Sequence, residues 1–206
     1  MLGMKILSMK NSEIDSLGNS LNNTHLIDKY LPEYQFSEHH QIEVNAKPDV
    51  VFNVAKELDI SGCFVSKILF GIRSVPYLFT KTDQKKPLLN LSAFLDGGFT
   101  LLEEDPPQEY VLGIVGQFWK PLPTIKKLTP GDFTAFTEPN FAKAAWNFRI
   151  SGNPTLPRSH LSTTTRIFCP PRYRGVMKIY WAAIQVFSGL VRKDILKQLK
   201  RISERS

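Results

Sequence analysis

Aromatic and hydroxyl side chains on predicted core elements are the residues of this sequence best suited to bind a small molecule. Large aromatic rings at such positions can line a pocket and stack against an apolar ring or chain. Two threonines on one strand face could hold the polar end of a ligand through their hydroxyls. Core packing and cross-strand pairing would use the same residues, so both interpretations stay open. The predicted ligand-binding residues are Trp119, Trp146, Phe148, Thr163, Thr165, Trp181 and Ile184.

The patterns that would indicate catalysis are weak. His39-His40 has no third ligand near it, and neighbouring strand residues point to opposite faces, so the pair does not predict a metal site. The carboxylates of residues 103–109 flank a predicted turn, where such groups are normally solvated. Ser188-Gly189 lacks the nucleophile-elbow pattern. We therefore predict no catalytic residue, no metal and no cofactor.

Length and composition indicate one globular domain. The sequence has 206 residues, of which 42% are hydrophobic and 22% are charged. It contains no run of ~18 apolar residues that would span a membrane, and its start does not resemble a secretory signal. Cys63 and Cys169 are too few for a disulfide framework. We expect a cytoplasmic protein with a flexible N-terminal extension over 1–23 and a single domain over 24–206.

The net charge of +7 is concentrated at the C-terminal end. Residues 1–60 carry −4, residues 61–140 carry zero, and residues 141–206 hold 13 basic and 2 acidic groups, which gives +11. Such an end attracts phosphates of nucleic acid or lipid, although a solvated helix face has the same composition. Aromatic residues do not interleave with the basic ones after Arg192, so nucleic-acid binding is not favoured. Peripheral contact with a membrane stays open.

Alternating and helical patterns predict a mixed α and β domain. Residues 34–45 alternate like a strand, and a helix begins at Pro48 with an apolar face. A second short helix is predicted over 63–72. Further strands are predicted over 99–104, 109–119, 133–137, 141–151 and 159–169.

Two other features of the pattern concern packing. Gly113 and Gly116 interrupt an apolar strand, which indicates a bulge or the close approach of a helix. A long amphipathic helix is predicted over 171–204, with a persistent apolar stripe. Its opposite face is predicted to carry Arg192, Lys193, Lys197, Lys200 and Arg201. Because the sheet must cover its apolar face, we expect it to wrap around this helix.

Several strings of the sequence resemble the START/SRPBCC superfamily, whose helix-grip fold is shared by lipid-transfer domains and birch-pollen-type allergens. The similarity covers roughly residues 24–205 and is strongest to uncharacterised bacterial members. The strings are Leu26-Ile27-Asp28-Lys29-Tyr30-Leu31-Pro32, Ala46-Lys47-Pro48-Asp49-Val50-Val51-Phe52, Leu112-Gly113-Ile114-Val115-Gly116-Gln117-Phe118-Trp119, Leu161-Ser162-Thr163-Thr164-Thr165-Arg166-Ile167, and Tyr180-Trp181 with Phe187-Ser188-Gly189-Leu190-Val191-Arg192.

The resemblance implies an α+β helix-grip fold, in which a curved antiparallel sheet holds a long C-terminal helix and two short helices follow the first strand. It also implies a cavity for a hydrophobic or amphipathic small molecule between sheet and helix. We therefore expect binding or transport of such a molecule rather than catalysis. The alternatives are a polyketide cyclase-like enzyme that uses Tyr110, Arg149 or Arg166, and an anionic membrane or nucleic-acid binder. The oligomeric state is not predicted.

Overall fold

The computed structural model describes residues 25–57, 95, 98–120 and 123–206. The predicted extension over 1–23 and the predicted short helix over 63–72 lie outside these residues. The described helices are α2 (Leu26–Tyr30), α3 (Pro48–Glu57), α6 (Pro130–Ala135), the 3₁₀ turn η4 (Pro171–Tyr173) and α7 (Arg174–Ser203). The described strands are β1 (Phe36–Val44), β2 (Thr100–Asp105), β3 (Glu109–Gly116), β4 (Ile125–Lys126), β5 (Ala142–Gly152) and β6 (Ser159–Phe168).

The strands form one antiparallel sheet in the order β1-β6-β5-β3-β2, with β4 paired to β3. Its register places Glu38 opposite Thr165 and His40 opposite Thr163. Because side chains alternate between the two faces of a sheet, these four residues point to the same face. On β5, Trp146 lies opposite Thr165 and shares that face.

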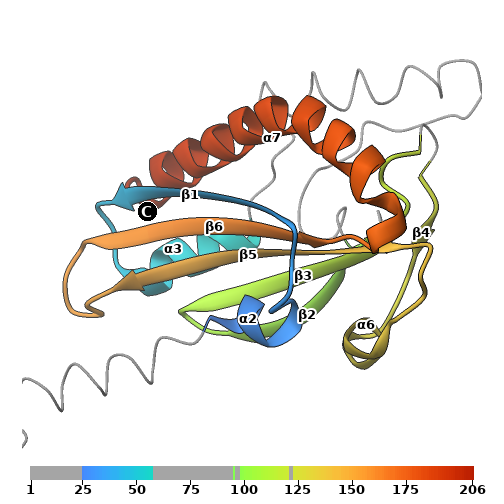
Figure 1. The fold of residues 1–206 in the computed structure, drawn as a ribbon. Coiled ribbons are helices and arrows are strands. Elements are labelled where there is room, and N and C mark those ends of the chain that lie inside the picture. The colour runs from blue at the N-terminus through green and yellow to red at the C-terminus, as the bar shows by residue number, and fades with distance from the viewer. Residues whose placement is uncertain (1–24, 58–94, 96–97, 121–122) are drawn as a thin grey trace, which may run out of the picture.

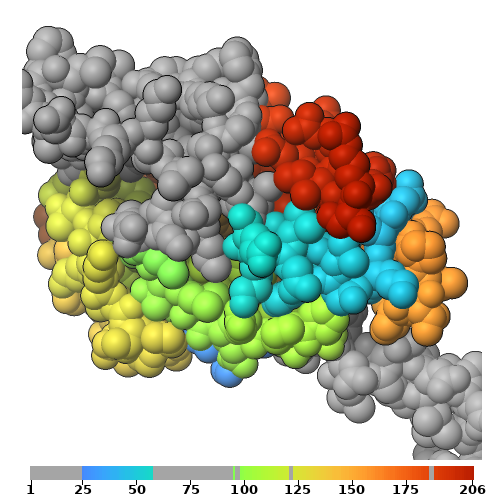
Figure 2. All heavy atoms as spheres, turned by 180° about the vertical axis from the view of Figure 1, so that it is seen from behind, coloured from blue at the N-terminus to red at the C-terminus, as the bar shows by residue number. Residues whose placement is uncertain are grey.

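Helices cover both faces of the sheet. Figure 1 shows α7 arched over one face, while α2 and α6 lie on the other. Viewed from behind, α3 lies beside the C-terminal part of α7 (Figure 2), and the two helices are in contact. This is the predicted α+β helix-grip arrangement.

Two apolar clusters lie at the interface between the sheet and α7. One lies under α3 and the C-terminal half of α7, and it includes Phe52, Phe148, Leu161, Ile195 and Leu199. The other lies at the N-terminal half of α7, and it includes Ala142, Ile167, Cys169, Met177 and Trp181. Full burial of a Leu, Ile, Phe or Met side chain stabilises a fold by about 1.5–3 kcal/mol, so these contacts hold α7 on the sheet.

The predicted apolar stripe of α7 is confirmed, but the prediction that Arg192 lies on the solvent face is wrong. Arg192 is buried. It lies four residues from Ser188 and from Leu196, and side chains at that spacing share one helix face. Its position on the helix, together with an acidic partner on β1, places it inside the domain despite its charge.

The predicted strand over 133–137 is also wrong, because the chain forms α6 there. Thr129 caps this helix, since its Oγ1 accepts a hydrogen bond from the Asp132 backbone N–H at 3.2 Å, and a proline follows in the first turn. Phe133 of α6 is buried against β3. A Cβ atom added at Gly113 would lie 2.9 Å from the Phe133 ring, so the predicted close approach of a helix is confirmed at this glycine.

Candidate ligand-binding site

A buried arginine lies at the centre of the interface between the sheet and α7. Nη1 of Arg192 donates to Glu38 Oε2 at 2.5 Å and to the hydroxyl of Ser188, and Nη2 donates to Thr165 Oγ1 at 2.7 Å. The side chains of Arg192 and Glu38 are only 11% and 9% exposed. Burial lowers the pKa of Arg192, and the neighbouring Glu38 carboxylate opposes part of that shift. The pair is a nearly dry, charge-balanced ion pair.

His40 completes this group of side chains. Its Nε2 lies 2.7 Å from Glu38 Oε1, so Glu38 lies between an imidazole and a guanidinium. The His40 side chain is 17% exposed. His39, the next residue, points to the opposite face and contacts Thr164 Oγ1 at 2.9 Å, as the alternation of strand residues predicts. We call Glu38, His40, Thr165, Ser188 and Arg192 the Arg192 cluster.

Gly189 allows the cluster to approach the backbone of α7. A Cβ atom at this position would lie 2.7 Å from Glu38 Oε1 and 3.5 Å from His40 Nε2. Any larger residue would therefore move the Glu38 carboxylate. Ser188-Gly189 also lies at the middle of α7, a helix that Figure 1 shows curved along its length, and Gly/Ser pairs are common at helix bends.

The Arg192 cluster separates the two apolar clusters on three different elements. Along each element, an apolar residue comes first, polar residues follow, and apolar residues come last. The order is Phe36, Glu38, His40, Ile42 and Val44 on β1, Ile167, Thr165, Thr163 and Leu161 on β6, and Trp181, Ser188, Arg192, Ile195 and Leu199 on α7. The interface is thus apolar at both ends and polar in the middle, a distribution that suits an amphipathic molecule.

Four of the predicted ligand-binding residues lie together, with Thr165 inside the Arg192 cluster and Trp146, Phe148 and Thr163 next to it. Trp146 Nε1 donates to Thr163 Oγ1 at 2.5 Å, and that hydroxyl donates to the backbone oxygen of Asn147 at 2.7 Å. The ring centroids of Trp146 and Phe148 are 5.0 Å apart. Thr165 accepts from Arg192. The two threonine hydroxyls do face inward, although both are engaged in hydrogen bonds within the protein.

The other three predicted residues lie at the far end of the interface, in the cluster around the N-terminal half of α7. Trp181 packs on Phe36, and their ring centroids are 5.9 Å apart. Trp119 stacks on Tyr173, and their ring centroids are 4.8 Å apart. Ile184 packs against the same cluster. The predicted set is therefore divided into two groups by the Arg192 cluster, and its role in binding stays a prediction.

Of the five residues of the cluster, sequence reasoning predicted only Thr165 and missed Glu38, His40, Ser188 and Arg192. A signal for the first two was present. They alternate with Phe36, Ile42 and Val44 at a period of two, which places all five on the inward face of β1. The charge of Arg192 predicts an outward position, although its spacing from Ile195 and Leu196 places it on the buried stripe.

Of the residues predicted for the enzyme alternative, only Tyr110 points toward α7. Its hydroxyl donates to the backbone oxygen of Ala55 at 3.0 Å. Its ring stacks on Phe148, with ring centroids 5.3 Å apart. Burial raises the pKa of Tyr110. Arg149 and Arg166 lie on the opposite face of the sheet. Arg166 forms an ion pair there with Asp28 at 2.6 Å.

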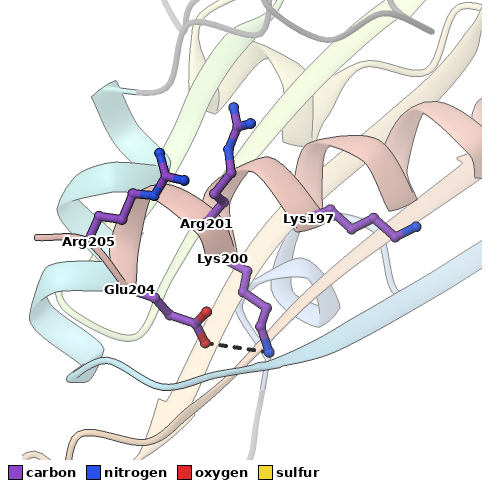
Figure 3. A pocket seen from close by; sticks show the side chains of 5 residues that line it. All are labelled: Lys197, Lys200, Arg201, Glu204 and Arg205. Atoms are coloured by element: carbon purple, nitrogen blue, oxygen red, sulfur yellow. Dashed lines mark ion pairs between the residues drawn. The ribbon is translucent and has the colours of Figure 1, made fainter.

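The basic end of α7 forms a separate surface feature (Figure 3). Lys197, Lys200, Arg201, Glu204 and Arg205 line a hollow of about 410 Å³. Lys200 turns toward β1, where its Nζ donates to Glu43 O at 2.8 Å and lies 3.4 Å from Glu204 Oε1. Nucleic-acid or membrane binding at this end stays a prediction. Within the described residues, no helix combines the length and apolar character needed to cross a bilayer.

Comparisons with known proteins show distant structural similarities. No protein-family model matches the sequence, and no curated protein matches it. A conserved protein from Geobacillus kaustophilus is 13% identical, with 81% of this chain and 96% of that chain covered and a TM-score of 0.38.

Two other solved structures are similar at still lower TM-scores. CalU16 from Micromonospora echinospora is 10% identical, with 81% and 85% covered and a TM-score of 0.28. Ara h 8.0201 is 8% identical, with 78% and 97% covered and a TM-score of 0.19. Because these scores are low, the helix-grip assignment rests on the chain's own topology, and membership of a bacterial subfamily stays a prediction.

Proposed function

We propose that this protein binds a hydrophobic or amphipathic small molecule between the sheet and α7, as a carrier or sensor. One observation supports this proposal above the others, namely the Arg192 cluster lying between two apolar clusters. A domain that needed only a stable core would gain little from a buried ion pair, because desolvating two charges offsets most of their attraction. A polar group at the centre of an apolar interface is useful when it fixes the orientation of a ligand.

The apolar clusters would supply most of the affinity. Each buried methylene group of a ligand contributes about 0.8 kcal/mol, so a chain of about twelve carbons contributes about 10 kcal/mol. Association itself costs about 4–15 kcal/mol and ordering of the chain costs more, so only part of this gain is measured as affinity. We expect micromolar binding for such chains.

Native mass spectrometry of protein purified from cells, with displacement of the neutral dye Nile red, tests the proposal. We expect a co-purified small molecule, or displacement of the dye by amphipathic chains. Phe148→Leu and Phe133→Leu form a matched pair, since each replaces a buried aromatic ring with a smaller aliphatic side chain. Phe148 lies on the face of the sheet toward α7, and Phe133 lies on the opposite face. Only Phe148→Leu should weaken dye binding. Absence of both a co-purified molecule and displacement would exclude the carrier function.

An enzyme that acts on a carbonyl substrate is the second candidate, and the position of His40 favours it. Glu38 links an imidazole, which can transfer protons, to a guanidinium, which can stabilise a developing oxyanion. Such a site would accelerate hydrogen–deuterium exchange at the central carbon of a β-diketone, followed by NMR. The enzyme function predicts a rate above that of buffer, lost in His40→Gln but kept in His160→Gln on the exposed part of β6. A rate equal to that of buffer would exclude it.

A further inference from the structure

We propose that the polar end of the ligand is an uncharged hydrogen-bond acceptor, the carbonyl oxygen of a ketone or ester, and that Arg192 receives it. This inference rests on the proposed binding function and names the class of ligand. It follows from the hydrogen-bonding capacity that the Arg192 cluster leaves unused and from the charge that the cluster already carries.

Among the described residues, the buried atom of the cluster that lacks any hydrogen-bond partner is a donor. A guanidinium has five N–H groups, and Arg192 directs three of them to Glu38, Ser188 and Thr165. Its Nε is buried and has no hydrogen-bond partner among the described residues. A buried donor without a partner is costly, so a group that satisfies it gains the corresponding free energy. Arginine has no acceptor, and a ligand group bound here must therefore accept.

The charge of the cluster selects a neutral acceptor. Arg192 and Glu38 already compensate each other, and their side chains are about nine-tenths buried. A carboxylate would add an uncompensated negative charge, and an ammonium would add a positive one and bring no acceptor. Either charge would be costly to bury without a partner of its own. A carbonyl oxygen satisfies the Nε–H and leaves the charge unchanged.

Among the described side chains of the cluster, His40 is the group that could let an anion bind instead. A cationic imidazole beside Glu38 would balance a carboxylate, and the charge of an imidazole depends on pH. The remaining side chains of the cluster, Thr165 from β6 and Ser188 from α7, do not titrate. Anion binding would therefore strengthen as the pH falls, whereas binding of a neutral carbonyl would not depend on pH.

Displacement of Nile red by four probes of equal chain length tests the inference. The probes are methyl laurate, laurate, dodecylamine and dodecane, each measured at about pH 6 and about pH 8. We expect methyl laurate to bind at least about tenfold more tightly than the other three at both pH values, because one hydrogen bond to a charged donor is worth about that factor. Laurate binding as tightly as the ester at either pH would overturn the inference.

Two variants locate the effect on Arg192. Arg192→Lys keeps a positive charge opposite Glu38 but removes the planar guanidinium with its Nε–H. The affinity for methyl laurate should therefore fall to the affinity for dodecane. Arg158→Lys makes the same change in an exposed ion pair with Glu43 and should alter nothing. An unchanged preference for the ester in Arg192→Lys would overturn the inference.

A spectroscopic measurement on the unaltered protein serves if Arg192→Lys does not fold. The Arg192 Nε–H resonance in a ¹⁵N spectrum should shift with methyl laurate and not with dodecane. An equal shift with both, or none with the ester bound, would overturn the inference. Equal displacement of the dye by all four probes would overturn the inference but would still support the carrier function. Displacement by none of the probes would exclude the carrier function itself.

Discussion

The buried ion pair between Glu38 and Arg192 makes a quantitative prediction about stability. Glu38→Gln removes the carboxylate and leaves the Arg192 charge buried without compensation. Breaking a buried pair from one side costs about 3–5 kcal/mol. The two side chains are 9% and 11% exposed, so solvent does little to screen the loss. For a chain of this length, each kcal/mol lowers Tm by about 2–4 °C, and we expect a fall of about 6–20 °C.

The opposite substitution should cost less. Arg192→Met leaves Glu38 beside His40, whose ring nitrogen lies 2.7 Å away and can donate a hydrogen bond to the carboxylate. We expect Glu38→Gln to lower the free energy of unfolding by about 5 kcal/mol and Arg192→Met to lower it by about 3 kcal/mol, the two ends of the range for a broken buried pair. The loss of unfolding free energy in the double variant should be smaller than the sum of the two single losses by at least about 2 kcal/mol, because no buried charge then lacks a partner.

Urea unfolding followed by circular dichroism measures all three values. The exposed pair of Glu43 and Arg158, with Nη2 and Oε2 2.8 Å apart and side chains 54% and 64% exposed, provides the control. Glu43→Gln, Arg158→Met and their double variant should leave the unfolding midpoint unchanged, since exposed pairs often contribute nothing measurable. A midpoint for Glu38→Gln equal to that of Glu43→Gln, or additive effects in the double variant, would refute the reasoning.

The remaining predictions concern other parts of the domain. Gly113→Ala should lower the free energy of unfolding, measured with urea, by about 1–2 kcal/mol. The added Cβ would lie 2.7 Å from Leu102 Cδ1 and 2.9 Å from the Phe133 ring. A variant more stable than the unaltered protein would contradict this packing. Thr129→Ala should cost about 1 kcal/mol by the same measurement, and Thr129→Ser should restore most of it if the N-cap matters. Burial raises the pKa of Cys169 from 9.0 to about 11, so stability should decline as the pH rises from about 9 to 11, because the unfolded thiol ionises first. Mass spectrometry after maleimide treatment of the native protein at neutral pH should find Cys169 unmodified, and rapid labelling would show that it is accessible.

Most of the fold follows from local patterns that can be read without a structure. The alternation in residues 141–151 and 159–169 and the apolar stripe of the last helix correspond to β5, β6 and α7. Residues 133–137 were misassigned because short apolar runs do not distinguish a strand from a single helical turn. The capping residue Thr129 and the proline after it were the better signal.

The candidate site was predictable only in part. Inward-facing threonines and aromatic rings follow from strand alternation, and Trp146, Phe148, Thr163 and Thr165 do lie together. The ion pair of Glu38 and Arg192 joins residues 154 positions apart, so no local pattern contains it. It depends on how α7 is rotated on the sheet, which tertiary packing decides.

A crystal structure of the protein with methyl laurate bound tests the central claim most directly. We predict an extended alkyl chain between β6 and α7, with its carbonyl oxygen within hydrogen-bond distance of Arg192 Nε. An ester bound on the outer surface, or an interface between sheet and α7 closed by side chains with Arg192 Nε bonded to protein alone, would contradict it.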